Sequence, residues 1–152
     1  MTGPEDKLAE LGLSLPAVPA PVAAYIPAIR TGSLVLTSGQ LPTREGQLLY
    51  VGKVGGEVDE ADAVECARQC ALNALAAIKA EVGSLDAIKR IVKVVAFVAS
   101  TPDFTGQPMI ANGASELLGE VFGDAGRHAR SAVGVPVLPL DAPVEVELMV
   151  EV

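Results

Sequence analysis

Residues 130–150 read RSAVGVPVLPLDAPVEVELMV and are the most informative part of this chain. Residues 130–137 are rich in Ala, Val and Gly, and the segment that follows, LPLDAP, has the composition of a turn between two apolar runs. Residues 144–152 alternate apolar and acidic side chains, which is the period of a half-buried strand. The pattern therefore predicts two paired strands, with Arg130 at the start of the first and Glu145 fifteen residues further on in the second.

The charges on these two predicted strands frame a candidate site. Alternation puts Glu145, Glu147 and Glu151 on one face, where acidic side chains are usually solvated. Arg130 is different, because a planar guanidinium grips a carboxylate through two parallel hydrogen bonds. It indicates either a structural ion pair with Glu145 or Glu147, or a binding site for an anionic ligand.

The composition is typical of one domain that assembles with copies of itself. A chain of 152 residues has the usual size of a domain, and we expect one domain over residues 1–152, with residues 1–22 as an extension packed on it. Half of the residues are hydrophobic and a fifth are charged, which is more apolar surface than a 15.6 kDa monomer readily hides. We therefore expect a homo-oligomer.

Neither a membrane nor a metal is an expected partner. No uninterrupted apolar stretch reaches the roughly 20 residues that a spanning helix needs, and the first residues, MTGPED, are acidic, so we expect a cytoplasmic location. Cys66 and Cys70 share one face of a predicted helix, where they fit as small core residues. Because the chain has a single histidine, a zinc cluster lacks ligands, and no cofactor is implied.

Periodicity and turn residues predict the other elements. Residues 59–82 form the clearest helix, with acids at its start and Gly83 after its end, and residues 107–122 form a second helix. The central strand covers residues 88–99, whose β-branched run indicates burial on both faces. The remaining predictions are a short helix over 4–12, an extended segment over 13–22, and strands over 23–30, 34–37 and 48–51. The sum is an α+β fold, with a single mixed β-sheet and two helices on one face.

Short motifs in a fixed order give the chain a resemblance to a known family. It resembles the RidA/YjgF family, also called endoribonuclease L-PSP, and in particular a longer-chain branch of it. The matching strings are Tyr25, LTSGQLP over 36–42, AFV over 96–98, Asp103-Phe104, Asn112, RSAV over 130–133, LP over 138–139 and VEVE over 144–147. The resemblance runs from residue 21 to residue 152. It implies a chorismate mutase-like fold that assembles as a homotrimer, with sites in clefts between subunits.

The resemblance also implies an activity. Family members hydrolyse reactive enamine and imine acids, such as 2-aminoacrylate and 2-iminopropionate, to the 2-oxo acid and ammonia. Carried over by motif, Arg130 would hold the substrate carboxylate, and Glu145 would orient water or pass a proton. The substrate-binding positions would be Tyr25, Ser38, Gly39 and Ala132.

Three positions near the predicted site need a separate interpretation. Ala132 stands where many family members have cysteine, and we expect it to act through its backbone, since imine hydrolysis needs no covalent nucleophile. His128 lies two residues before Arg130 but corresponds to no catalytic position of the family. Asn112 is expected to make local hydrogen bonds on its own helix.

Other functions stay open on the sequence. A net charge of −8, with 11 basic against 19 acidic residues, and few aromatic side chains argue against nucleic acid as the substrate, despite the ribonuclease name of the family. A non-catalytic module that binds small carboxylates at Arg130 is one alternative. A chorismate mutase-like enzyme is another, although that reaction needs several cations and the matched site supplies one arginine.

Overall fold

The computed structural model describes residues 2–18 and 24–152. Residues 19–23, which hold the end of the predicted extension and the start of the predicted strand 23–30, lie outside the described residues, as does Met1. The helices and strands, in chain order, are α1 (Pro4–Glu10), β1 (Ala28–Thr31), β2 (Leu34–Thr37), β3 (Thr43–Arg44), β4 (Gln47–Leu48), α2 (Glu60–Val82), β5 (Arg90–Ala99), α3 (Gln107–Phe122), β6 (Ala129–Val135) and β7 (Val144–Glu151). Short 3-10 turns cover Leu85–Ala87, Gly123–Gly126 and Pro139–Asp141.

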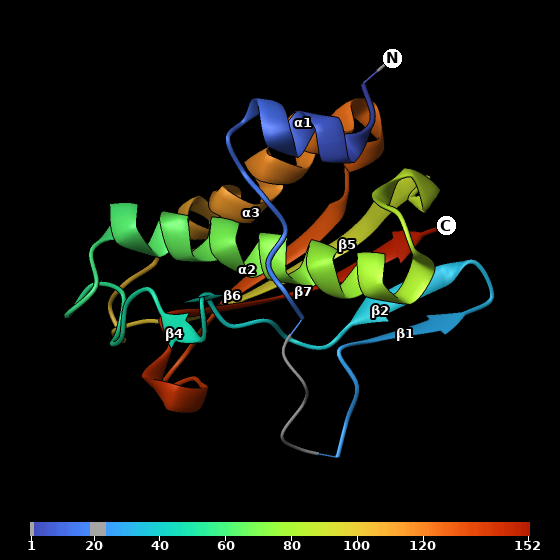
Figure 1. The fold of residues 1–152 in the computed structure, drawn as a ribbon. Coiled ribbons are helices and arrows are strands. Elements are labelled where there is room, and N and C mark those ends of the chain that lie inside the picture. Colours follow the sequence, from blue (N-terminus) through green and yellow to red (C-terminus); the bar gives the residue numbers. More distant parts are fainter. Residues whose placement is uncertain (1, 19–23) are drawn as a thin grey trace.

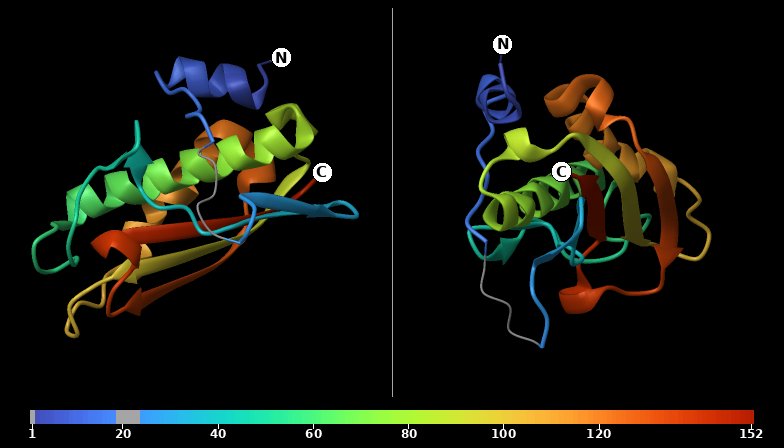
Figure 2. Two further views of the ribbon diagram at one scale, coloured as in Figure 1. Left: turned by 60° about the horizontal axis from the view of Figure 1, so that its bottom comes forward. Right: turned by 90° about the vertical axis from the view of Figure 1, so that its right-hand side faces the viewer.

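The main sheet has five strands in the order β1-β2-β7-β5-β6. β5 and β6 run parallel, and the other neighbours are antiparallel, so the sheet is mixed. Both α2 and α3 lie on the same side of it (Figures 1 and 2). These features confirm the predicted α+β fold with two helices on one face of a mixed sheet.

The two long helices begin and end where the sequence predicts. Asp59 caps α2 by accepting a hydrogen bond from the backbone N–H of Asp62, and Gly83 ends it with φ of 92°. α3 ends in the same way at Gly123, with φ of 61°. The two helices touch closely at Gly113, where an added Cβ would lie 2.1 Å from the carbonyl oxygen of Val64. The sequence of α3 therefore fixes how near it lies to α2.

The predicted strand over 48–51 is wrong, and the sheet is not single. Gln47–Leu48 pairs instead with Thr43–Arg44 in a separate two-stranded ladder. The reason is local, because Glu45 and Gly46 have positive φ and turn the chain back at once. The buried amide of Asn73 on α2 then holds this hairpin by donating to the carbonyl oxygens of Leu41 and Thr43.

The predicted pairing of residues 130–137 with residues 144–152 is also wrong. β5 lies between β6 and β7, with Val94 beside Arg130 on one edge and Phe97 beside Glu145 on the other. α3 carries the chain from β5 back to the start of β6, and this crossover makes the two strands parallel neighbours. β7 then takes the free edge of β5, after a connection in which Leu140 and Asp141 have positive φ.

The face of the sheet away from the helices is the open face, and strand alternation assigns its residues. Val144, Val146 and Leu148 are buried toward the helices, so the residues between them point the other way. No helix within residues 2–18 and 24–152 covers this side, as the left view of Figure 2 shows. The open face includes Lys93, Val95, Phe97, Ser131, Val133, Glu145, Glu147 and Met149.

The N-terminal helix packs across the helical layer rather than on the sheet. α1 lies beside α3 in Figure 1, and Leu8 on α1 is buried in the main core. Glu5 adds an ion pair with Lys79 of α2. None of the helices in the described residues is long and apolar enough to cross a membrane.

Two glycines of α3 provide a test of this packing. We expect Gly113→Ala to lower the free energy of unfolding by about 1–3 kcal/mol, because its methyl group would meet the backbone of α2. Gly119→Ala is the control, since nothing lies within 4 Å of a Cβ there, and alanine should stabilise the helix by about 0.5–1 kcal/mol. Urea denaturation measures both, and equal effects of the two substitutions would contradict the close approach.

Candidate functional site

Arg130 lies on the helix side of β6. It is in register with Val94, and partners on parallel strands point to the same face. Its guanidinium reaches α3, where Nη1 donates to Oδ1 of Asn112 at 2.8 Å and to Oγ of Ser115 at 3.2 Å. Asn112 makes the predicted local contact on its own helix, from Nδ2 to Sδ of Met109 at 4.0 Å, and its amide oxygen in addition holds the arginine, which the sequence did not predict.

The alternative that Arg130 forms an ion pair with Glu145 or Glu147 does not hold within one chain. An ion pair from Arg130 to either glutamate would have to reach across β5. Among residues 2–18 and 24–152, neither of these carboxylates lies within ion-pair distance of Arg130. Nε and Nη2 of Arg130 have no acceptor among the described residues. Since the side chain is only partly buried, these N–H groups can still meet a ligand.

His128 lies next to the same hydroxyl. Its Nε2 is 2.9 Å from Oγ of Ser115, and its Nδ1 is 2.6 Å from the carbonyl oxygen of Gly126. We call Asn112, Ser115, His128 and Arg130 the arginine group. Ser115 was missed by sequence reasoning, although its place three residues after Asn112 on a helix puts both side chains on one face.

Ala132 follows Arg130 on the same side of β6. It is in register with Ala96, a buried residue of β5. A methyl group there offers no reactive atom, so the position contributes space and backbone beside the arginine.

Glu145 lies on the open face and is held against the β2–β3 connection. An added Cβ at Gly39 would lie 2.5 Å from Oε1 of Glu145, so a side chain there would displace the carboxylate from this position. The neighbouring backbones are fixed by two hydrogen bonds, from Gln40 N–H to the carbonyl oxygen of Val146 at 2.8 Å and from Val146 N–H to that of Gln40 at 3.0 Å.

Ser38 connects Glu145 and Gly39 with the segment that holds Tyr25. The Ser38 hydroxyl donates to the carbonyl oxygen of Ile26 at 2.6 Å, and its backbone N–H donates to that of Pro27 at 2.8 Å. Tyr25, directly before Ile26, is 53% exposed. We call Tyr25, Ser38, Gly39 and Glu145 the glutamate group.

The structure thus sorts the predicted site residues into two groups that do not meet within the chain. The arginine group lies on the helix side of β6, and Glu145 lies on the open face of β7. β5 stands between them. Within one subunit, Arg130 and Glu145 therefore do not face a common pocket.

The pKa of the Glu145 carboxyl is raised above its ordinary value. Burial is the main cause, because partial removal from water disfavours the charged form. The negative charge of Glu147, two residues along the same strand face, adds to it. A carboxyl with this shift can take up and release a proton nearer to neutral pH than a solvated glutamate.

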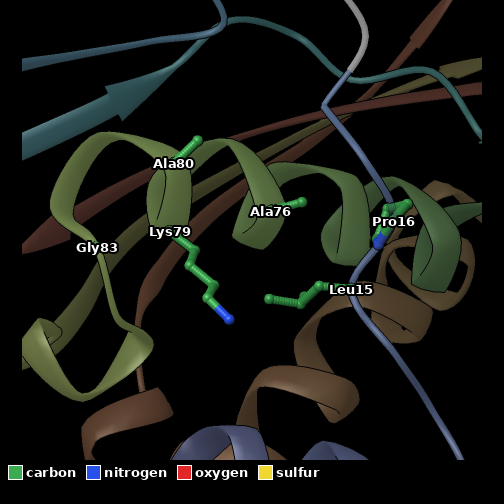
Figure 3. A pocket seen from close by; sticks show the side chains of 6 residues that line it. All are labelled: Leu15, Pro16, Ala76, Lys79, Ala80 and Gly83. Carbon is green, nitrogen blue, oxygen red and sulfur yellow. The ribbon is translucent and has the colours of Figure 1, made fainter.

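Other parts of the molecule offer less chemistry. Cys66 and Cys70 are buried free thiols, as predicted, and burial raises the pKa of Cys66 to about 12, so it stays protonated. Within the described ranges, no three His, Cys, Asp or Glu side chains are arranged to hold a metal ion. A hollow of about 330 Å³ lies beside α2 (Figure 3), and its lining contains none of the predicted site residues: Leu15, Pro16, Ala76, Lys79, Ala80 and Gly83.

The influence of Glu147 on Glu145 can be measured directly. We expect Glu147→Gln to lower the pKa of Glu145, because it removes a nearby negative charge and leaves burial unchanged. Glu151→Gln is the control, since Glu151 lies further along the same face. A carbon-13 NMR titration of the glutamate carboxyls measures the shift, and an unchanged pKa in Glu147→Gln would contradict the interpretation.

Comparison with known proteins agrees with this fold over nearly the whole chain. Residues 5–152 match the model of a family described as "YjgF/chorismate mutase-like, putative endoribonuclease". Protein TCP17 of Trypanosoma cruzi is 43% identical over 145 residues, which are 95% of this chain and 91% of that protein.

Solved structures match as well. The crystal structure of Atu1372 from Agrobacterium tumefaciens, a protein of unknown function, has a TM-score of 0.91 and 45% identity, over 98% of this chain and 92% of that one. The crystal structure of E. coli TdcF with bound serine has a TM-score of 0.66 and 25% identity, over 89% and 93% of the two chains. Since the family model spans all but the first four residues, this chain belongs to the RidA/YjgF family.

Proposed function

We propose that the protein is a hydrolytic deaminase of small enamine and imine acids, of the 2-aminoacrylate and 2-iminopropionate type. The observation that carries the proposal is the state of Arg130. Asn112 and Ser115 hold Nη1, while Nε and Nη2 have no acceptor in the described part of the chain. These two nitrogens form the side of a guanidinium that binds a carboxylate through parallel hydrogen bonds.

A complete site requires two subunits in this proposal. The arginine group and the glutamate group lie on opposite sides of the sheet, so one chain leaves each half unfinished. In a cyclic homotrimer the same two surfaces meet at every interface, and Arg130 of one subunit faces Glu145 of the next. Val133 and Met149 on the open face give such an interface apolar area to bury.

The reaction needs little beyond these groups. Arg130 binds the carboxylate of 2-iminopropionate and so fixes the position of the imine carbon. Glu145 orients a water molecule, whose oxygen bonds to that carbon, and passes a proton to the nitrogen. The C–N bond then breaks, which gives pyruvate and ammonia from one imine and one water. The raised pKa of Glu145 suits a group that alternately holds and releases a proton.

Similarity to TdcF supports a small ligand with a carboxylate. That protein is described with bound serine, which carries the same carboxylate as a 2-imino acid. Its likeness extends over 89% of this chain.

The deaminase activity is tested by generating 2-iminopropionate with an amino-acid oxidase, with semicarbazide as a competing trap. We expect the wild type to accelerate formation of pyruvate, and Arg130→Ala to lower kcat/KM by about 100-fold or more, because a charged partner of the carboxylate is lost. Arg127→Ala is the matched control, since Arg127 is exposed and lies just outside β6.

Failure of the wild type to accelerate the reaction would contradict the proposal. Pyruvate binding in calorimetry without turnover would instead favour a non-catalytic carboxylate-binding module, because that function needs the same free side of Arg130. A chorismate mutase activity is opposed by the arginine group, which holds one arginine where that reaction needs several cations.

The family description also names endoribonuclease activity. The net charge of −8 opposes binding of a polyanion. RNA cleavage that persists in highly purified protein and disappears in Arg130→Ala would favour this activity over the deaminase.

A further inference from the structure

We infer that Ser115 and His128 are positioning residues that set the orientation of the Arg130 guanidinium. This inference rests on the proposed function, because it concerns how Arg130 presents itself to a substrate carboxylate. Neither residue corresponds to a position for which the family resemblance implies a role.

The guanidinium of Arg130 is held at one of its nitrogens. Its Nη1 carries two hydrogens, and the structure gives each one an acceptor, Oδ1 of Asn112 and Oγ of Ser115. A guanidinium bound at two points of one nitrogen no longer rotates freely. The hydrogens on Nε and Nη2 then point together to the opposite side, where a carboxylate can accept both.

The second step is the direction of the Ser115 hydroxyl. Because its oxygen accepts a hydrogen from Arg130, its own hydrogen must point elsewhere, and Nε2 of His128 lies 2.9 Å away. A carbonyl oxygen only accepts, so Nδ1 of His128 carries the hydrogen toward Gly126 at 2.6 Å. With the serine hydrogen directed at Nε2, the hydrogen bonds run in one direction, from Arg130 through Ser115 and His128 to Gly126.

The third step is the anchor of this chain of hydrogen bonds. Gly126 is buried, and an added Cβ there would lie 2.3 Å from the carbonyl oxygen of Leu118 on α3. The backbone that receives the bond from His128 is thus packed directly on the helix that carries Ser115. Both ends of the network are fixed to α3, so it can hold Arg130 without a ligand.

A hydroxyl that donates to a histidine can also serve as a nucleophile. Here the Ser115 oxygen already accepts an N–H from a cation, which occupies one of its two lone pairs and makes the oxygen a weaker nucleophile. The geometry therefore assigns Ser115 a positioning role. Holding the long arginine side chain in advance saves the loss of rotamer freedom when the ligand binds.

The test measures binding of pyruvate, as the product, by calorimetry, so it does not depend on turnover. We expect Ser115→Ala to weaken Kd by about tenfold, with kcat for 2-iminopropionate changed less than about twofold at saturating substrate, because the arginine contributes binding in both the ground state and the transition state. Ser115→Thr keeps the hydroxyl and should restore wild-type binding.

His128→Phe, which keeps a ring but removes both nitrogens, should weaken Kd to the same degree as Ser115→Ala. The double variant should bind no worse than either single variant, since the two residues act through one chain of hydrogen bonds. Thermal denaturation checks that each variant is folded. If Ser115→Ala or His128→Phe does not fold, the other single variant carries the test.

The outcomes separate this inference from the proposed function. If Arg130→Ala weakens pyruvate binding but Ser115→Ala and His128→Phe leave it within about twofold of wild type, the positioning role is wrong and the proposed function stands. Multiplicative losses in the double variant would also overturn the positioning role. If Arg130→Ala itself leaves pyruvate binding unchanged, the proposed function fails first.

Discussion

β5 lies between β6 and β7, and the separation of the two predicted catalytic residues depends on this arrangement. Because β6 pairs with one edge of β5 and β7 with the other, Arg130 and Glu145 are kept apart although they are close in sequence. The pairing also fixes their faces, since Arg130 shares the side of Val94 and Glu145 shares the side of Phe97. A protein that uses both groups on one ligand must therefore combine two subunits, which is the basis of the proposed assembly.

Packing of the helical layer determines the state of the arginine. α3 approaches α2 closely at Gly113, directly after Asn112 and two residues before Ser115. The side chains that bind Nη1 of Arg130 thus lie on either side of the point where the backbones of α2 and α3 come close. The carboxylate of Glu145 lies against the backbone of Gly39, in space that a side chain at that position would fill. In each of the two groups a glycine therefore allows a close approach, between the backbones of α2 and α3 at Gly113 and between Glu145 and the backbone at Gly39.

The sequence predicted local structure well and strand neighbours poorly. Alternation along residues 144–152 and the caps of α2 are local signals, and the structure has both elements within a residue or two of the prediction. Which strands pair is decided by contacts far apart in the chain, and alternation is the same for β7 whether its neighbour is β5 or β6. The arginine group was underestimated for a related reason. Asn112, Ser115 and His128 meet only after α3 folds back on β6, and nothing in the spacing of His128 from Arg130 indicates that a serine links them.

The most direct test of the central claim mixes two inactive variants, Arg130→Ala and Glu145→Gln, which are unfolded together and refolded as one assembly. If each site takes Arg130 from one subunit and Glu145 from the next, random mixing leaves about a quarter of the sites with both residues intact, so about a quarter of the wild-type imine hydrolysis should return. Separately refolded variants should remain inactive. The mixture could instead be as inactive as its components while each variant still forms the wild-type oligomer. Arg130 and Glu145 would then not act together in a site between subunits, and the account would be contradicted.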